Sequence, residues 1–134
     1  MRSRSLLSVS ALVVAGAVAG VDSLHAQAAA PMKIDPVAAQ WGQYIWKNRQ
    51  CQGCHELGRD QSTGPDLVGV TNRRSADWLR SWFKDPSAMT SSDSIAMALK
   101  KKYGSQMPNL DLKPRDIEGL INYLAQETQS RTGK

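Results

Sequence analysis

Both cysteines of the 134-residue chain, Cys51 and Cys54, stand within the segment CQGCH, which ends at His55. Two thiols and an imidazole at this spacing suit three kinds of site: a redox-active disulfide, part of a zinc site, or the covalent attachment of a c-type haem. Each kind of site requires a different fold around it. The rest of the sequence therefore has to distinguish the three sites and, with them, the folds.

The disulfide and the zinc site are the weaker interpretations. Thioredoxin-like redox sites stand on a βαβ framework, whereas no segment of this chain alternates convincingly as a strand. A disulfide also leaves His55 without a role. A structural zinc site usually takes four Cys or His ligands, and only three such residues remain once an N-terminal leader is removed. A fourth zinc ligand would have to be a carboxylate.

A c-type haem uses all three residues of the motif. Its two vinyl groups form thioether bonds with two thiols, and the histidine that follows the second cysteine is held where its imidazole can bind iron. C-x-x-C-H is the attachment signature for this cofactor. We therefore predict one haem c, covalently bound through Cys51 and Cys54, with His55 as an iron ligand.

The N-terminal segment, residues 1–26, has the pattern of a secretory signal peptide. Arg2 and Arg4 precede an apolar stretch at 6–21, and small residues then allow cleavage after Ala26 or Ala28. An uncleaved membrane anchor is the alternative, but the apolar run is short for a span of about 20 residues. Export agrees with a c-type haem, which is attached outside the cytoplasm. We therefore predict a periplasmic protein.

Cleavage after Ala26 leaves 108 residues, enough for one small domain, with 15 basic and 11 acidic residues and a net charge of +4. His55 is then the only histidine. A chain of this size buries its surface inefficiently, so a covalent cofactor would add to its stability. The modest charge and the lack of a base-stacking motif disfavour nucleic acid as a partner, and no second apolar run is long enough to span a membrane.

Helical periodicity predicts an all-α fold of about four short helices and long loops. We expect a flexible leader at 27–35 and one domain at 36–134. The expected helices run from Pro36 into Cys51, over 76–84, over about 93–103, and onward from about Pro114.

Local signals mark several ends of these helices. Ser75 can cap the second helix, which the pair Asp85-Pro86 ends, and Gly104 stops the third. The last helix begins after Lys113 without an obvious capping side chain. The segments 58–74 and 105–112 are expected to be loops, as is the segment that contains Met89.

Four segments occur in an order that resembles the class I monohaem cytochromes c. They are CQGCH, GPDL at 64–67, MPNL at 107–110 and DIEGLINYL at 116–124. The resemblance extends from Trp41 to about Gln126, nearly the whole expected domain. It implies a fold that wraps a single haem and leaves one haem edge exposed.

The resemblance also implies particular roles for side chains. The first and last helices should cross closely, with Gly42 as the small residue and Tyr123 as the aromatic residue of the contact. The second ring nitrogen of His55 should donate a hydrogen bond to the carbonyl of Pro65, which would orient the ring and strengthen its donation to iron. An ordinary Gly-Pro turn is the plainer interpretation of Pro65.

The sixth iron ligand is sought among four methionines. Met32 lies in the expected leader, and Met97 points away from the apolar face of its helix. Met89 is the second candidate. Met107 is favoured because Pro108 stiffens its loop and because that loop resembles the ligand loop of the cytochromes c.

Three aromatic residues, Trp78, Trp82 and Phe83, are expected to pack over the haem. An indole N–H could bond a haem propionate, but the sequence does not choose between the tryptophans. Arg73 and Arg74 either pair with propionates or belong to a solvated loop.

The predicted function is that of a single-electron carrier and not of an enzyme, because a His/Met-ligated iron has no open position for substrate. The lysines at 100–102 either favour the helix dipole or steer an acidic redox partner. The segment 71–89 and the MPNLDL loop resemble cytochromes that serve periplasmic reductases, nitrous oxide reductase in particular, with a respiratory-chain or dehydrogenase donor. The alternatives are a haem subunit of an oxidoreductase such as sulfite dehydrogenase, and a five-coordinate haem that binds small ligands. The oligomeric state is not predicted.

Overall fold

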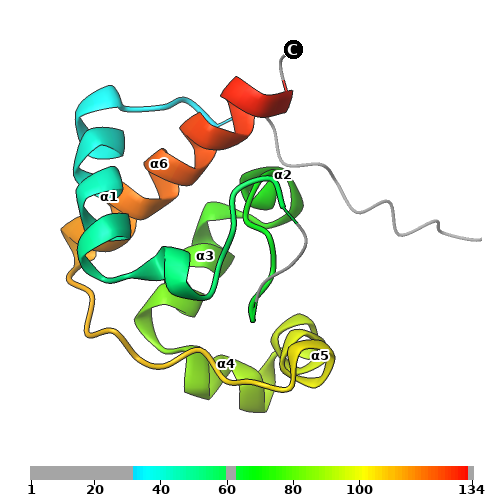
Figure 1. The fold of residues 1–134 in the computed structure, drawn as a ribbon. Helices are drawn as coiled ribbons and strands as arrows, with labels where there is room; N and C mark the ends of the chain where they lie inside the picture. The colour runs from blue at the N-terminus through cyan, green and yellow to red at the C-terminus, as the bar shows by residue number, and fades with distance from the viewer. Residues whose placement is uncertain (1–31, 60–62, 133–134) are drawn as a thin grey trace, which may run out of the picture.

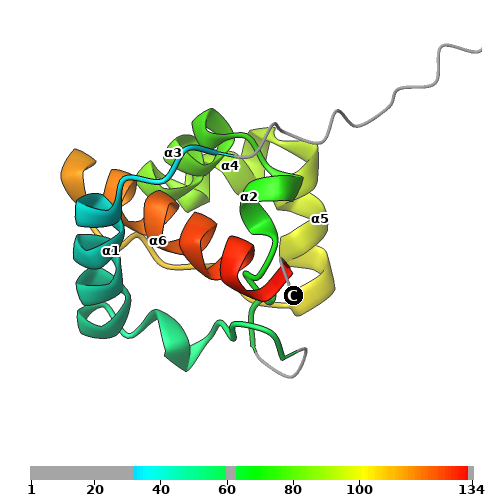
Figure 2. The same ribbon diagram turned by 90° about the horizontal axis from the view of Figure 1, so that it is seen from above.

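The regular elements of the computed structural model, which describes residues 32–59 and 63–132, are all helices (Figures 1 and 2). No strand occurs among these residues, which confirms the predicted all-α class. The helices are α1 (Pro36–Asn48), the short 3-10 helix η1 (Cys51–Gly53), α2 (Val70–Arg73), α3 (Ala76–Lys84), α4 (Pro86–Ser92), α5 (Ser94–Tyr103) and α6 (Pro114–Thr132).

The predicted signal peptide and residues 27–31 lie outside the described residues. The segment that precedes α1 lies alongside α6. The backbone N–H of Asp35 donates to Asn122 Oδ1 at 2.8 Å, and Gln129 Nε2 donates to the carbonyl of Met32 at 3.0 Å. No helix in the described ranges is both long enough and apolar enough to cross a membrane.

The close crossing of α1 and α6 depends on two glycines. A Cβ on Gly42 would overlap the carbonyl of Gly119 and lie 2.8 Å from the backbone nitrogen of Leu120. A Cβ on Gly119 would lie 3.0 Å from the nitrogen of Gly42. The predicted role of Gly42 is thus confirmed. Tyr123 packs against Trp46 of α1, with ring centroids 5.9 Å apart.

The first turn of α6 is held by Asp116. One of its carboxylate oxygens accepts the backbone N–H of Lys113 at 3.1 Å, and the other accepts the indole N–H of Trp41 at 2.9 Å. The first contact compensates for the missing capping side chain at Lys113, in the manner of half a capping box. The second ties α6 to α1. These contacts satisfy a carboxylate that is only 7% exposed.

The expected helix limits are corrected in three places. Helix α1 ends at Asn48, before Cys51, and the segment expected as a loop at 58–74 contains the single turn α2. The segment with Met89 forms α4 and is not a loop. Asp85 explains why α4 forms, because it ends α3 and also caps α4 by accepting the N–H of Ala88 at 2.9 Å. Pro86 suits the first turn that follows.

Other helix ends are as expected. Ser75 accepts the N–H of Trp78 at 3.2 Å and caps α3, and Gly104 ends α5 with φ 66°.

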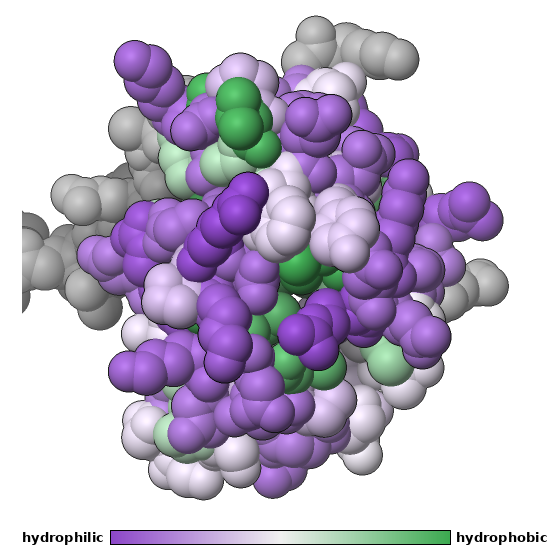
Figure 3. Space-filling view, turned by 90° about the vertical axis from the view of Figure 1, so that its left-hand side faces the viewer, coloured by the Kyte–Doolittle hydropathy of each residue, from purple (hydrophilic) through white to green (hydrophobic). Residues whose placement is uncertain are grey.

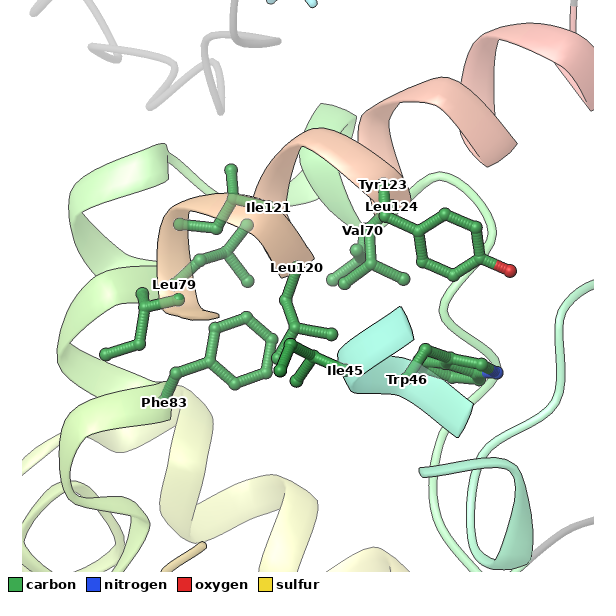
Figure 4. Packing of buried hydrophobic residues seen from close by; sticks show 10 residues of the cluster. Ile45, Trp46, Val70, Leu79, Phe83, Leu120, Ile121, Tyr123 and Leu124 are labelled. Atoms are coloured by element: carbon green, nitrogen blue, oxygen red, sulfur yellow. The ribbon is translucent and has the colours of Figure 1, made fainter. Parts of the chain in front are cut away.

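The core lies between α6 and the helices that pack on it (Figure 4). On the face shown in Figure 3, polar and charged side chains cover most of the surface. The labelled core side chains are Ile45, Trp46, Val70, Leu79, Phe83, Leu120, Ile121, Tyr123 and Leu124.

We expect Gly42→Ala to lower the free energy of unfolding by about 2 kcal/mol, because inserting a methyl group into a tightly packed contact costs about 1–3 kcal/mol. Here the obstacle is backbone, which cannot rotate away. Denaturant unfolding of the haem-loaded protein measures the change. Gly53→Ala is the matched control, since a Cβ there meets no heavy atom within 4 Å. Equal stability of the two variants would contradict the proposed contact.

Candidate functional site

A cavity with about 210 Å³ of space open to water-sized molecules lies beside the core. Protein interiors contain few voids larger than one water molecule, so a space of this size indicates a ligand site. All three residues of the motif line it: Cys51, Cys54 and His55. Its apolar walls include Trp46, Leu67, Val70, Trp78, Leu79, Trp82, Phe83, Leu99, Leu120 and Leu124.

The backbone of the motif curls around one carbonyl group. The N–H groups of Cys54 and His55 both donate to the carbonyl of Cys51, at 3.2 and 2.9 Å. Gln50, with φ 53°, makes the turn that separates this curl from α1. Cys51 is half-buried and Cys54 is exposed. Burial raises the pKa of the Cys51 thiol, which keeps it protonated at neutral pH.

His55 is oriented by the segment that faces it. Its Nδ1 lies 2.9 Å from the carbonyl oxygen of Pro65. Because a carbonyl only accepts, Nδ1 carries the proton and Nε2 keeps the lone pair that a metal would bind. A Cβ at Gly64 would lie 2.7 Å from the ring, so the ring's position requires glycine there. Burial lowers the pKa of His55, the bond to Pro65 partly opposes this, and the ring remains neutral.

Met107 is the methionine that lines the cavity among the four in the described ranges. Its sulfur accepts the indole N–H of Trp82 at 3.1 Å. Met89 lies on α4 and Met97 is 44% exposed on α5, and neither lines the cavity. Met32 packs against the core from the segment before α1 and is also absent from the cavity wall.

Trp78 carries a buried donor without an acceptor. Its Nε1 has no hydrogen-bond partner, although the ring is stacked on Trp82 with centroids 5.6 Å apart. An unsatisfied buried donor costs about 1–3 kcal/mol. Since Trp78 lines the cavity, the donor indicates an acceptor on the ligand. The guanidinium of Arg74 lies 5.4 Å from the same ring and adds positive charge nearby.

Arg73 has a structural role that the sequence did not reveal. Its guanidinium donates to the carbonyls of Val68 at 2.7 Å and Asp66 at 3.1 Å. These bonds hold the chain that follows Pro65. Arg73 thereby helps to fix the segment against which His55 is oriented.

The residues of the cavity fit a haem. Two cysteines are present for the two thioether bonds, and a neutral imidazole is present for the iron. Apolar walls suit the porphyrin, and the unsatisfied N–H of Trp78 suits a propionate carboxylate. The sequence located the motif but not this donor, because which tryptophan lacks a partner depends on the packing of α3.

Comparison with known proteins agrees with this geometry. The family model "Cytochrome c" matches residues 39–128. A cytochrome c from Rhodothermus marinus has a similar structure, with a TM-score of 0.69, 28% identity, and coverage of 73% of this chain and 83% of that one. The cytochrome c domain of the pp3183 protein from Pseudomonas putida is 36% identical, with a TM-score of 0.58 and coverage of 69% and 95%.

An engineered cytochrome c from Rhodothermus marinus is also similar, with 25% identity, a TM-score of 0.68, and coverage of 77% of this chain and 88% of that one. No protein with a curated description matches the chain. The family model covers most of the described residues, including the motif and the crossing helices. The chain therefore belongs to the cytochrome c family of electron-transfer proteins, which are not enzymes, and it binds haem c through Cys51 and Cys54.

Proposed function

We propose that this protein is a periplasmic single-electron carrier in which His55 and Met107 would be the two protein ligands of the haem iron. The observation that supports this most is the composition of the cavity wall. Among the described residues, the wall holds one imidazole, that of His55, and one thioether, that of Met107. His55 precedes α2 in the sequence, and Met107 follows α5. When bound, the haem supplies a one-electron couple, and a methionine ligand favours its reduced form.

The chain's own residues keep that couple confined to electron transfer. The Pro65 carbonyl holds the proton on Nδ1 of His55, so the ring has one orientation and one free lone pair. The apolar walls exclude water from the site and limit the rearrangement that accompanies a change of charge. Two protein ligands would leave no position for a substrate.

An exposed cysteine marks the place where electrons can leave. Cys54 is exposed whereas Cys51 is half-buried. A cofactor bonded to both side chains therefore has one side close to the surface. Electron exchange at this edge needs only brief contact with another protein, which suits a carrier that moves between partners.

The surface charge supports an acidic partner. Lys100, Lys101 and Lys102 are exposed in the last turn of α5, and Lys100 also lines the cavity. Positive charge therefore lies beside the site, and the chain as a whole has a net charge of +5. The predicted signal peptide supports a periplasmic setting. The resemblance of 71–89 to cytochromes that serve nitrous oxide reductase suggests a reductase as electron acceptor.

Replacing Met107 with Leu tests whether this residue binds the iron. We expect the variant to lose the weak far-red absorption that arises from sulfur bound to ferric iron, and to have a lower reduction potential, because leucine fills a similar volume but cannot bind iron. Met89→Leu is the control and should leave both properties unchanged.

Carbon monoxide supplies the second measurement. The reduced wild-type protein should bind it poorly and the Met107→Leu variant readily. Ready binding by the wild type would mean a five-coordinate iron, and loss of the far-red band in Met89→Leu instead would mean that the wrong loop was chosen.

Charge neutralisation tests the partner surface. We expect electron transfer to an acidic redox protein to slow as salt rises, mainly through the association rate, because attraction between exposed charges fades beyond about 8 Å at physiological salt. Changing residues 100–102 to Gln should remove much of that rate at low salt. The same change at Lys33, Lys47 and Lys84, which do not line the cavity, removes equal charge and should have a smaller effect. Equal losses would indicate that docking does not use the end of α5.

A further inference from the structure

Helix α1 exposes apolar side chains on its outer side. In the part of the chain that the structure describes, three large hydrophobic side chains are exposed, those of Val37, Tyr44 and Met97, and the first two belong to α1. Val37 is 73% exposed and Tyr44 is 53% exposed. Trp41 lies between them and is half-buried. At 3.6 residues per turn, positions 37, 41 and 44 share one side of a helix. We call these three residues the α1 stripe.

The α1 stripe faces away from the core and from the haem cavity. The buried residues of α1 lie on the other side of the helix and include Gly42, Ile45 and Trp46. Trp46 lines the cavity, whereas no residue of the α1 stripe does. Among the described elements, α6 and η1 pack closely on α1. Both ribbon views place α1 at the edge of the fold, with its outer side uncovered by these elements (Figures 1 and 2).

The middle of the α1 stripe is held in place before any partner binds. The ring of Trp41 stacks on Tyr44 with centroids 5.1 Å apart, and its indole N–H donates to Asp116 at 2.9 Å. The guanidinium of Arg115 lies 4.1 Å from the centroid of the same ring. An ordered surface loses little conformational entropy when a partner covers it. Trp, Tyr and Arg are also the residue types that contribute most to binding at protein interfaces.

The charges beside the α1 stripe are positive. Arg115 lies over its tryptophan, and Lys47 follows its tyrosine by one turn; both are exposed. Helix α1 contains no acidic residue. Two neighbouring carboxylates are already engaged, because Asp35 caps α1 and Asp116 is buried with both oxygens bonded. A surface with an apolar centre and a rim of carboxylates would complement this arrangement.

We propose that the α1 stripe is an anchoring surface for an acidic protein partner, which holds the cytochrome while the haem edge near Cys54 stays open. A second copy of this chain is a poor occupant, because its own Arg115 and Lys47 would meet the same cations. A membrane is also a poor occupant. An apolar helix face on a membrane enters the headgroup region, but Trp41 is bonded to Asp116 and covered by Arg115. The inference is independent of which residue binds the iron.

A designed peptide tests the surface. The probe is an amphipathic helical peptide with leucines on one face and glutamates on both sides of them, and its counterpart has lysine at each glutamate position. Nuclear magnetic resonance of the reduced, haem-loaded protein follows the backbone amide signals. The acidic peptide should shift signals of α1 and of the first turn of α6, with an affinity that falls as salt rises, and the basic peptide should shift none. Absence of binding by the acidic peptide, or shifts confined to 51–55 and 100–107, would overturn the proposal.

Substitutions in the α1 stripe separate its contribution from that of exposed apolar atoms in general. Changing Val37 and Tyr44 together to Ser should weaken binding of the acidic peptide by about tenfold, as expected for residues at the centre of an interface. Arg115→Gln should weaken binding and reduce its dependence on salt. Met97→Ser is the matched control, because it removes an exposed apolar side chain from α5 and should leave the affinity unchanged. Equal weakening in the control and in the double variant would overturn the proposal.

The remaining measurements distinguish anchoring from docking at the haem edge and from the other occupants. Reduction of the haem by ascorbate should proceed at the same rate with and without saturating acidic peptide, and strong slowing would overturn the anchoring role. Sedimentation identifies the other occupants. A wild-type dimer that dissociates in the double variant would mean that a second copy covers the α1 stripe. Binding to phosphatidylglycerol vesicles that is lost in the same variant would mean a membrane. Either result would overturn the choice of an acidic protein.

Discussion

The backbone contact between Gly42 and Gly119 is the constraint on which the remaining structure depends. It allows α1 and α6 to cross without intervening side chains. At this distance Trp41 can reach Asp116, and Trp46 can pack on Tyr123. The end of α1 then leads, through the turn at Gln50, into the motif at 51–55. The position of the cysteines relative to the core is thus set by a contact that contains no cofactor ligand.

Features that depend on neighbouring residues in the sequence were predicted well. Ser75 and Gly104 act within one turn of their own helices, and the motif at 51–55 needs only its own spacing to attach haem. The part of the cavity wall that contains Met107 was predicted in part. Pro108 made Met107 the favoured candidate, and the structure places that residue on the cavity wall. Its bond to iron remains a prediction.

Features that depend on contacts distant in the sequence were missed. Gly119 is one residue of an amphipathic helix until α1 is laid across it. Asp116 resembles an ordinary acidic residue in a first turn, and its second bond to Trp41 spans 75 positions. The helix α4 was missed for a different reason. The pair Asp85-Pro86 ends α3 and also begins α4, but it was used only to predict the end of a helix.

Trp78 and Trp82 show how two residues of the same type on the cavity wall can differ in their hydrogen bonding. The two rings are stacked on one helix, yet their donors differ in what they meet. One N–H already has its acceptor in Met107, whereas the other is buried with none. Such a buried donor lowers the stability of the protein unless a bound group accepts its hydrogen bond. The asymmetry therefore separates a hydrogen bond that the chain completes by itself, from Trp82 to the Met107 sulfur, from one that it leaves for the cofactor to complete.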